Sequence, residues 1–391
     1  MIKRIIINNR KKYIVNVPTW DVPIVGAGDD YGIYPGTSSL TSSGNVSITS
    51  LTLVNQTDYG SGTVFGFDRY LMSGSRYLFA SDGINLTVFD TIDPLNLVQI
   101  GQLTWPSSNV ESMTISGNYI YAFQVDANLY TVDISDITTP NIVATFSIID
   151  GVNVLAYYPW HWCFIEGNLL YGQGHYGGGG AGDAGSCLIL DISDPLNISY
   201  ASVLHHDFGG EASPGGGDMC KVGDYLYFGD YFYSSYFSWP GRVLIADVSD
   251  PYNASVVGQF FDPDPGDPGP GFPQMDPWRI ISKDNILYVL DDFVIQCWDL
   301  TDPLVPVRVK SVYGGADTEG AIITNKIMFN IINDGKVLEA YTLNDASDPV
   351  LEQSLILSAG GSNITDFDDR NYLYGAIGGK LAIFHYTFTT S

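Results

Sequence analysis

The stretch LILDISDPLN, Leu188–Asn197, recurs along the chain with small changes. Five variants follow the same pattern: LTVFDTIDPLN from Leu86, LYTVDISDITTPN from Leu129, VLIADVSDPYN from Val243, IQCWDLTDPLVP from Ile295 and LEAYTLNDASDP from Leu338. A phrase that recurs along one chain indicates a structural unit that is stacked on copies of itself.

The turn-forming aspartates of these phrases are spaced by about the length of a propeller blade. We place them at Asp93, Asp136, Asp194, Asp250, Asp302 and Asp348, with successive differences of 43, 58, 56, 52 and 46 residues. A period of about 40–50 residues in strand-like sequence is typical of a four-stranded blade. Asp side chains bond nearby backbone amides and Pro presets φ, so we interpret the phrase as a structural turn and not as a catalytic motif.

Each unit divides into four strands in the same order. A first strand precedes a Gly/Asn turn and a second follows it, as in MTISGNYIYAF; the third is the LYTVDIS type, and the fourth follows the Asp-Pro turn. The blades are expected at about 63–104, 110–148, 154–206, 212–261, 275–312, 318–357 and 362–388. The last unit supplies only three strands, and GNVSITSLTLV, Gly44–Val54, fits the missing outer one.

The sequence therefore predicts an all-β protein, a seven-bladed β-propeller of four-stranded blades. Residues 44–391 form the propeller, the strand at 44–54 closes the ring as the outer strand of the last blade, and residues 1–43 form an N-terminal arm. Closure by strands from both ends of the chain would remove two open sheet edges. Six blades with an extra sheet is the alternative.

The repeats resemble the LVIVD-repeat family of β-propellers. The likeness covers about residues 63–388 and is strongest at Asp191–Pro195 and Asp247–Pro251. The resemblance implies the propeller architecture. It implies little about function, because members of the family look like surface or secreted proteins and few have an assigned activity. The chain departs from the family pattern in lacking a secretion signal and in carrying insertions in blades three to five.

The charge balance excludes some partners. The 391 residues hold 17 basic and 43 acidic side chains, a net charge of −26. Such a chain repels phosphate backbones and anionic membranes, so we expect neither nucleic-acid binding nor membrane insertion. No signal peptide or apolar membrane span is found. We expect an extracellular particle or a cell surface, reached without a signal peptide, rather than the cytoplasm.

Five long, Gly- and Pro-rich segments are predicted to lie on one face of the ring: 150–161, 172–186, 205–217, 229–241 and 261–277. Loop length gathered on one face of a rigid scaffold usually marks the functional surface. Aromatic residues in or beside these segments are candidate ligand-binding residues: Tyr158, Trp160, Trp162, Tyr176, Tyr231, Tyr233, Tyr236, Trp239 and Trp278. Such rings suit sugar stacking or a protein interface. The alternative is that they only anchor the loops.

A second candidate site lies in the central channel. Aligning the inner strands on their Gly/Asn turns brings seven residues to one level: Asp68, Glu111, His161, Gly217, Trp278, Glu319 and Ile364. Of these, Asp68, Glu111, His161 and Glu319 could hold a divalent cation or poise a general base. Asp218 could replace Gly217 if the register slips by one residue. The alternative is that these groups are only solvated.

The first twelve residues hold five basic side chains: Lys3, Arg4, Arg10, Lys11 and Lys12. A basic, β-branched strand on an acidic protein suggests that residues 1–43 are a docking arm, which would add a strand to a protein neighbour or to the chain's own propeller.

These observations favour a non-enzymatic binding or structural module. It would present an aromatic, acidic loop face to a glycan, a surface receptor or another protein, as a component of a larger assembly such as a virion or a cell-surface structure. The alternative is a metal-dependent hydrolase or oxidase with its site at the channel mouth on the same face. The sequence leaves the question of an enzyme open and assigns no catalytic residue.

Overall fold

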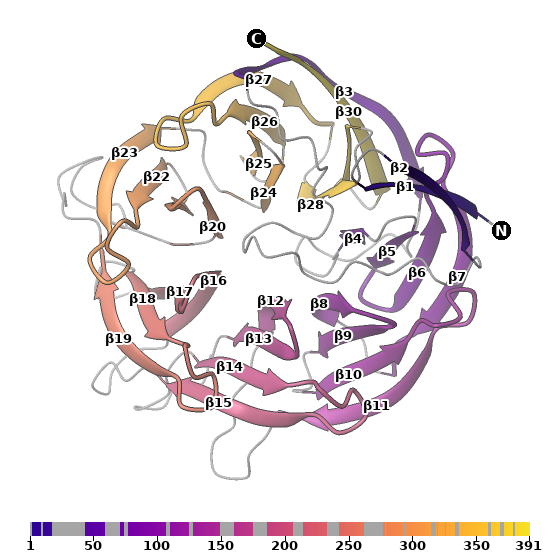
Figure 1. The fold of residues 1–391 in the computed structure, drawn as a ribbon, viewed down its shortest axis with the longest axis horizontal. Coiled ribbons are helices and arrows are strands. Elements are labelled where there is room, and N and C mark those ends of the chain that lie inside the picture. The colour runs from indigo at the N-terminus through magenta and orange to yellow at the C-terminus, as the bar shows by residue number, and fades with distance from the viewer. Residues whose placement is uncertain are drawn as a thin grey trace.

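The computed structural model describes residues 2–8, 11–17, 44–58, 71–73, 77–106, 110–124, 128–148, 160–174, 186–205, 214–232, 242–261, 277, 279–291, 294–313, 318, 320–324, 326–332, 336–358, 361–367, 371–377 and 380–391. Seven four-stranded antiparallel sheets stand around a common centre, and each sheet is one blade (Figure 1). The predicted seven-bladed β-propeller is therefore confirmed, and the six-bladed alternative is wrong.

Blades one to three use consecutive strands from the centre outward. Blade one holds β4 (Leu71–Ser73), β5 (Tyr77–Ser81), β6 (Asn85–Asp90) and β7 (Val98–Thr104). Blade two holds β8 (Val110–Ser116), β9 (Tyr119–Gln124), β10 (Asn128–Asp133) and β11 (Asn141–Ser147). Blade three holds β12 (Trp160–Glu166), β13 (Leu169–Gly174), β14 (Ser186–Asp191) and β15 (Ser199–His205).

Blades four to six repeat the order, and blade seven combines the two ends of the described propeller sequence. Blade four holds β16 (Pro214–Val222), β17 (Tyr225–Phe232), β18 (Arg242–Asp247) and β19 (Ser255–Phe260). Blade five holds β20 (Arg279–Lys283), β21 (Ile286–Leu290), β22 (Val294–Asp299) and β23 (Val307–Tyr313). Blade six holds β24 (Gly320–Thr324), β25 (Ile327–Ile332), β26 (Val337–Thr342) and β27 (Val350–Ile356). Blade seven holds β28 (Gly361–Phe367), β29 (Tyr372–Ile377), β30 (Lys380–Thr390) and β3 (Val46–Asp58).

Burial within a blade explains the two kinds of strand sequence. The second and third strands, such as β21 and β22, lie between neighbouring blades and are buried along almost their whole length, which fits continuous apolar runs such as ILYVL. The outer strand β11 alternates between half-buried and exposed residues, because only one of its faces meets the protein.

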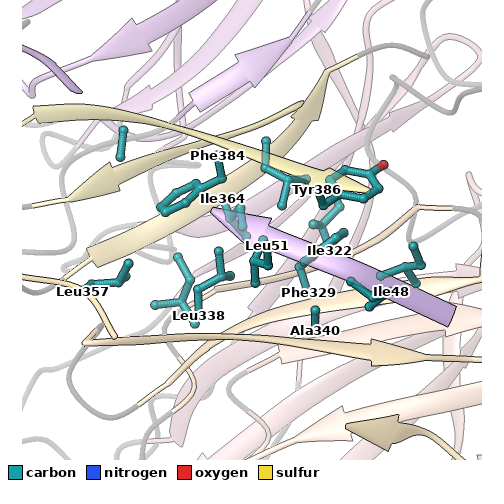
Figure 2. Packing of buried hydrophobic residues seen from close by; sticks show 14 of the residues in the cluster. Ile48, Leu51, Ile322, Phe329, Leu338, Ala340, Leu357, Ile364, Phe384 and Tyr386 are labelled. Atoms are coloured by element: carbon teal, nitrogen blue, oxygen red, sulfur yellow. The ribbon is translucent and has the colours of Figure 1, made fainter. Parts of the chain in front are cut away.

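The ring is closed by the N-terminal strand β3, as the sequence predicts. It pairs with β30 over eleven residue pairs, from Val46 opposite Thr390 to Asp58 opposite Lys380. In Figure 1, β3 lies on the outside of the ring beside β30. Figure 2 shows Ile48 and Leu51 of this strand among the buried side chains shared by blades six and seven, which include Phe329. Burial of that apolar surface stabilises the closed ring by about 25 cal/mol for each Å² removed from water.

Blade six also holds the closing strand by polar contacts. The side chain of Asn344 accepts a bond of 2.6 Å from the amide of Val46 and donates one of 2.7 Å to its carbonyl oxygen. Lys326 donates to the Gly44 carbonyl at 2.9 Å, and Ser47 donates to Glu352 at 2.9 Å. The amide of Asn344 thus pairs with the strand as a backbone group would.

The sixth turn differs from the prediction. We define the aspartate turns by a backbone bond from the fourth residue to the carbonyl of the first: Asp93–Asn96, Asp136–Thr139, Asp194–Asn197, Asp250–Asn253, Asp302–Val305 and Asp345–Asp348. Asp345 therefore takes the place that the sequence alignment gave to Asp348. The alignment failed because Asp348 precedes the only proline in the phrase, whereas the turn begins three residues earlier.

The strands β1 (Ile2–Asn8) and β2 (Lys11–Val17) of the arm pair with each other, antiparallel, and form a separate two-stranded sheet. No helix in the described part of the chain is long and apolar enough to cross a membrane.

Candidate functional site

The blade topology gives the ring two unlike faces. The turn face carries the six aspartate turns and the two-residue turns that join first to second strands. In blade five this second type of turn places Asp284 and Asn285 at φ 50° and 61°, the left-handed conformation that a type I′ turn needs. The loop face, at the opposite ends of the strands, carries the second-to-third and blade-to-blade connections. The long segments predicted for blades three to five leave the strands on this face, for example between Gly174 and Ser186.

The predicted aromatic ligand-binding residues fall on the loop face or outside the described residues. Trp160 and Trp162 belong to the inner strand β12, and Tyr231 lies near the end of β17. The others lie outside the described residues: Tyr158, Tyr176, Tyr233, Tyr236, Trp239 and Trp278. Their role in binding stays a prediction.

The predicted metal ring is described only in part. Glu111 and His161 lie on the adjacent inner strands β8 and β12, whereas Asp68 and Glu319 lie outside the described residues. At the same level, Ile364 is 1% exposed and belongs to the core shared by blades six and seven. Among the described residues no group of three or more His, Cys, Asp or Glu side chains could hold a metal ion.

Two glycines of blade four make room for Pro277, which precedes blade five, at the loop-face ends of their strands. A Cβ on Gly217 would lie 2.0 Å from the carbonyl oxygen of Pro277, and a Cβ on Gly229 would lie 2.7 Å from the same atom. Any larger residue would clash with backbone at both positions. Gly217, which the sequence alignment placed on the channel ring, is therefore buried against Pro277, which packs on β16 and β17.

Asp218, beside this contact, is the substitute that the sequence analysis named for the channel ring. It is 5% exposed and forms an ion pair of 3.3 Å with Arg279, which is 1% exposed. Its carboxylate accepts bonds from the amides of Met219 at 2.8 Å and Ile280 at 3.1 Å, and Arg279 donates to the carbonyl of Ala321 at 2.9 Å. These contacts join blades four, five and six. Asp218 is thus a structural partner of Arg279 and no open channel ligand.

Gln173 adds a further buried polar contact between blades at the loop-face ends of the strands. It is 4% exposed, and its side-chain nitrogen donates to the carbonyl of Gly229, at 2.5 Å, across the boundary between blades three and four. Burial raises the pKa of Asp218, and the Arg279 charge and the two amides oppose that rise. The loop-face ends of blades three to six are therefore fastened to one another by buried polar contacts. Loops built on such a base start from fixed positions.

The turn face is acidic. Hydrogen bonds from side chains and amides of the turns lower the pKa of Asp136, Asp194, Asp247, Asp299 and Asp345, so these carboxylates stay charged. Tyr252 of blade four lowers the pKa of Asp191 in blade three by donating to it at 2.5 Å. This supports the structural interpretation of the recurring phrase, because the Asp side chains that begin the six turns accept bonds from amides of their own turns.

One recurring structural residue was not predicted from the sequence. The hydroxyl of Tyr288, the third residue of β21, donates to the carbonyl of Ala346 in the next blade's turn at 2.7 Å. Tyr121, Tyr171, Tyr227 and Tyr374 occupy the same place in their own blades. Burial is the largest cause of a raised pKa at Tyr121, to about 12. The signal was present in the sequence as a tyrosine three positions after the turn between first and second strands in five of the seven blades.

All four cysteines are buried free thiols. Burial raises the pKa of Cys163, Cys220 and Cys297 to about 12, so these thiols stay protonated and unreactive. Cys220 donates to the hydroxyl of Ser282 in the next blade at 3.0 Å.

Comparison with known proteins gives the fold alone. No family model matches the sequence, and no curated protein matches it. The β-propeller domain of Myceliophteria thermophila Cps50 (Swd1) superposes with a TM-score of 0.58 at 13% identity, over 86% of this chain and 100% of that one. The WD40 propeller of Doa1 gives 0.60 at 10% identity, over 86% and 97%. A chain of the mitotic checkpoint complex gives 0.60 at 13%, over 86% and 94%.

Proposed function

We propose that this protein is a non-enzymatic binding module of a larger assembly, in which the loop face recognises a partner. The partner would be a glycan, a surface receptor or another protein, and the assembly a virion or a cell-surface structure. A β-propeller is a fold typical of protein-interaction modules, and proteins of similar fold include a chain of the mitotic checkpoint complex. We also propose that the chain is related to the LVIVD-repeat family of β-propellers.

The observation that carries this proposal is the difference between the two faces. The turn face is built of short aspartate turns, each closed by its own hydrogen bonds. The loop face of blades three to five is where the strands give way to long connections, above a base fixed by the Asp218–Arg279 pair and by Gln173. The connections carry Tyr176, Tyr233 and Trp239. A fixed base with variable, aromatic loops is the arrangement that binding proteins use.

The experiment is a binding screen with matched variants. Full-length protein is applied to an array of defined oligosaccharides and to a panel of purified cell-surface proteins. For any ligand found, we expect Tyr233→Ala or Trp239→Ala to weaken binding at least tenfold. Tyr252→Ala is the control, because Tyr252 is an aromatic residue that is 53% exposed on the turn face. Equal loss with Tyr252→Ala, or the absence of any ligand, would contradict the proposal.

The metal-dependent alternative is separated by elemental analysis of the purified chain. One metal ion per chain that is lost in Glu111→Ala and His161→Ala would favour an enzyme at the channel mouth. Loop-face binding that persists in both variants would favour the binding module.

A further inference from the structure

Positive charge is distributed very unevenly along the chain. Residues 1–17 contain five Lys and Arg and no Asp or Glu. Residues 77–220, by contrast, contain fifteen Asp and Glu and no Lys or Arg. Blades four, five and seven hold basic side chains on their sheets, such as Arg242, Arg308 and Lys380. One side of the ring, blades two and three, therefore contains no Lys or Arg, and the first 17 residues of the arm contain no Asp or Glu.

Blades two and three keep these carboxylates charged and accessible. Asp136 and Asp194 are exposed, and hydrogen bonds within their turns lower the pKa of each. Exposed apolar side chains lie on the same two blades: Val143 on β11 is 37% exposed and Leu196 in the blade-three turn is 53% exposed. This surface combines negative charge with apolar contacts, and its outer strands β11 and β15 each have an open edge.

The hairpin of β1 and β2 has the complementary composition and lacks a sheet to join. Its sequence combines five basic residues with β-branched residues such as Ile5, Ile14 and Val15. Ile5 lies opposite Ile14 in a sheet of two strands that belongs to no blade. An isolated two-stranded hairpin is marginally stable in water, so this one gains stability by packing on another surface.

We propose that the basic hairpin of one copy, residues 2–17, docks on the outer side and the turn face of blades two and three of a second copy. The inference rests on the proposed role in an assembly and names the acceptor surface for the arm. Opposite charge draws the two surfaces together, whereas two propellers without their arms would repel each other. Because donor and acceptor are different surfaces, the contact is head-to-tail and produces rings or open chains of copies.

The first test compares masses by light scattering at 0.1 M and 0.5 M salt. The full-length protein is expected to exceed the mass of one chain at low salt and to dissociate at high salt, because exposed charges are then screened. A chain without residues 1–17 is expected to be monomeric at both. Assembly that persists without the arm would overturn the proposal.

The second test locates the acceptor with a synthetic peptide of residues 1–17 and the truncated propeller. Thr145→Lys with Ser199→Lys places two cations on β11 and β15, at exposed positions on blades two and three. Ser255→Lys with Ser354→Lys is the matched control at exposed positions on β19 and β27. We expect the peptide dissociation constant to rise at least fivefold in the first variant and less than twofold in the second. An equal change in both would overturn the choice of blades two and three.

Three further outcomes are decisive. If the peptide binds the truncated propeller but the full-length protein is monomeric, the arm occupies its own propeller and the second copy is excluded as the occupant. If the full-length protein does not self-assemble but still binds a ligand through its loop face, this inference fails and the proposed function stands. If Trp239→Ala abolishes ligand binding and leaves self-assembly intact, the two surfaces act independently, as proposed.

Discussion

The hydroxyl of Tyr227 in blade four donates a hydrogen bond of 2.9 Å to the carbonyl oxygen of Pro303 in the turn of blade five. Tyr288 makes the same contact one blade further on. In blade six the position is Phe329, and there the next blade has no aspartate turn, because its outer strand β3 comes from the N-terminal side of the ring. The hydroxyl is thus absent where its acceptor is absent. Nothing in the structure explains Phe79, which also lacks a hydroxyl.

This contact predicts opposite effects for two conservative changes. Tyr227→Phe removes one hydrogen bond between blades and should lower the free energy of unfolding by about 1 kcal/mol. Phe329→Tyr buries a hydroxyl beside Tyr386, where no turn carbonyl exists, and should cost about 1–3 kcal/mol. Urea unfolding curves of the two variants and the parent would check both values. A stabilising Phe329→Tyr would show that another acceptor exists.

The buried ion pair of Asp218 and Arg279 predicts strong coupling. Asp218→Asn leaves the Arg279 charge buried without its counter-charge and should destabilise the protein by about 3–5 kcal/mol. The double variant Asp218→Leu, Arg279→Met removes both charges. Its loss of stability should be clearly smaller than the sum of the losses in the single variants Asp218→Leu and Arg279→Met. A double-mutant cycle from urea unfolding measures this difference. Strict additivity would contradict the pair as described.

Glu339 predicts a pH dependence of stability. It is 7% exposed on β26 and accepts a hydrogen bond from Tyr341, and burial raises its pKa above the ordinary value of 4.5. The folded protein therefore holds this proton more tightly than the unfolded chain. The favourable contribution is complete below pH 4.5 and is lost as the pH rises through the folded pKa.

The change Glu339→Gln should remove this dependence. Relative to the variant, the parent protein should lose stability as the pH rises above 4.5 and then level off. Unfolding free energies measured at half-unit pH steps would show it. Parallel curves for parent and variant would contradict a raised pKa at this position.

The corrected turn of blade six predicts unequal effects of two neighbouring aspartates. The Asp345 carboxylate accepts bonds from the amide and the hydroxyl of Ser347 at 2.9 and 2.7 Å, so Asp345→Ala should lower the unfolding temperature measurably. Asp348→Ala loses an ion pair of 3.0 Å with Lys310, both partners being about half exposed, and should cost well under 1 kcal/mol. Thermal unfolding of both variants checks the order. The reverse order would restore the alignment made from the sequence.

Much of the fold could be predicted from the sequence because the aspartate turn is a local motif. Asp194 and its equivalents cap amides two residues away, so each copy of the phrase carries its own structural signal. The closing strand was predicted from a count of strands, because a blade with three strands leaves an edge that must be covered. Asn344 was not predicted, since its role depends on Val46, nearly three hundred residues away in the sequence.

The candidate site could be predicted far less well. Asp218 resembled a channel ligand in the sequence, but its partner Arg279 lies on another blade, and only the packing of inner strands reveals it. Gly217 resembled a gap in a polar ring, whereas it makes room for the carbonyl of Pro277. The proposed binding role depends on loop conformation, which no repeat pattern encodes.

The pairing of β3 with β30 also sets an order of events during synthesis. The ribosome completes residues 46–58 before any blade exists, yet their partner, residues 380–390, is made more than three hundred residues later. At about 5–20 residues per second, the first strand waits on the order of tens of seconds or more with an unpaired edge. Six blades can form in sequence during that interval, but the propeller ring cannot close. A nascent chain of this protein therefore remains open, and vulnerable to pairing with its neighbours on a polysome, until its last strand has been made.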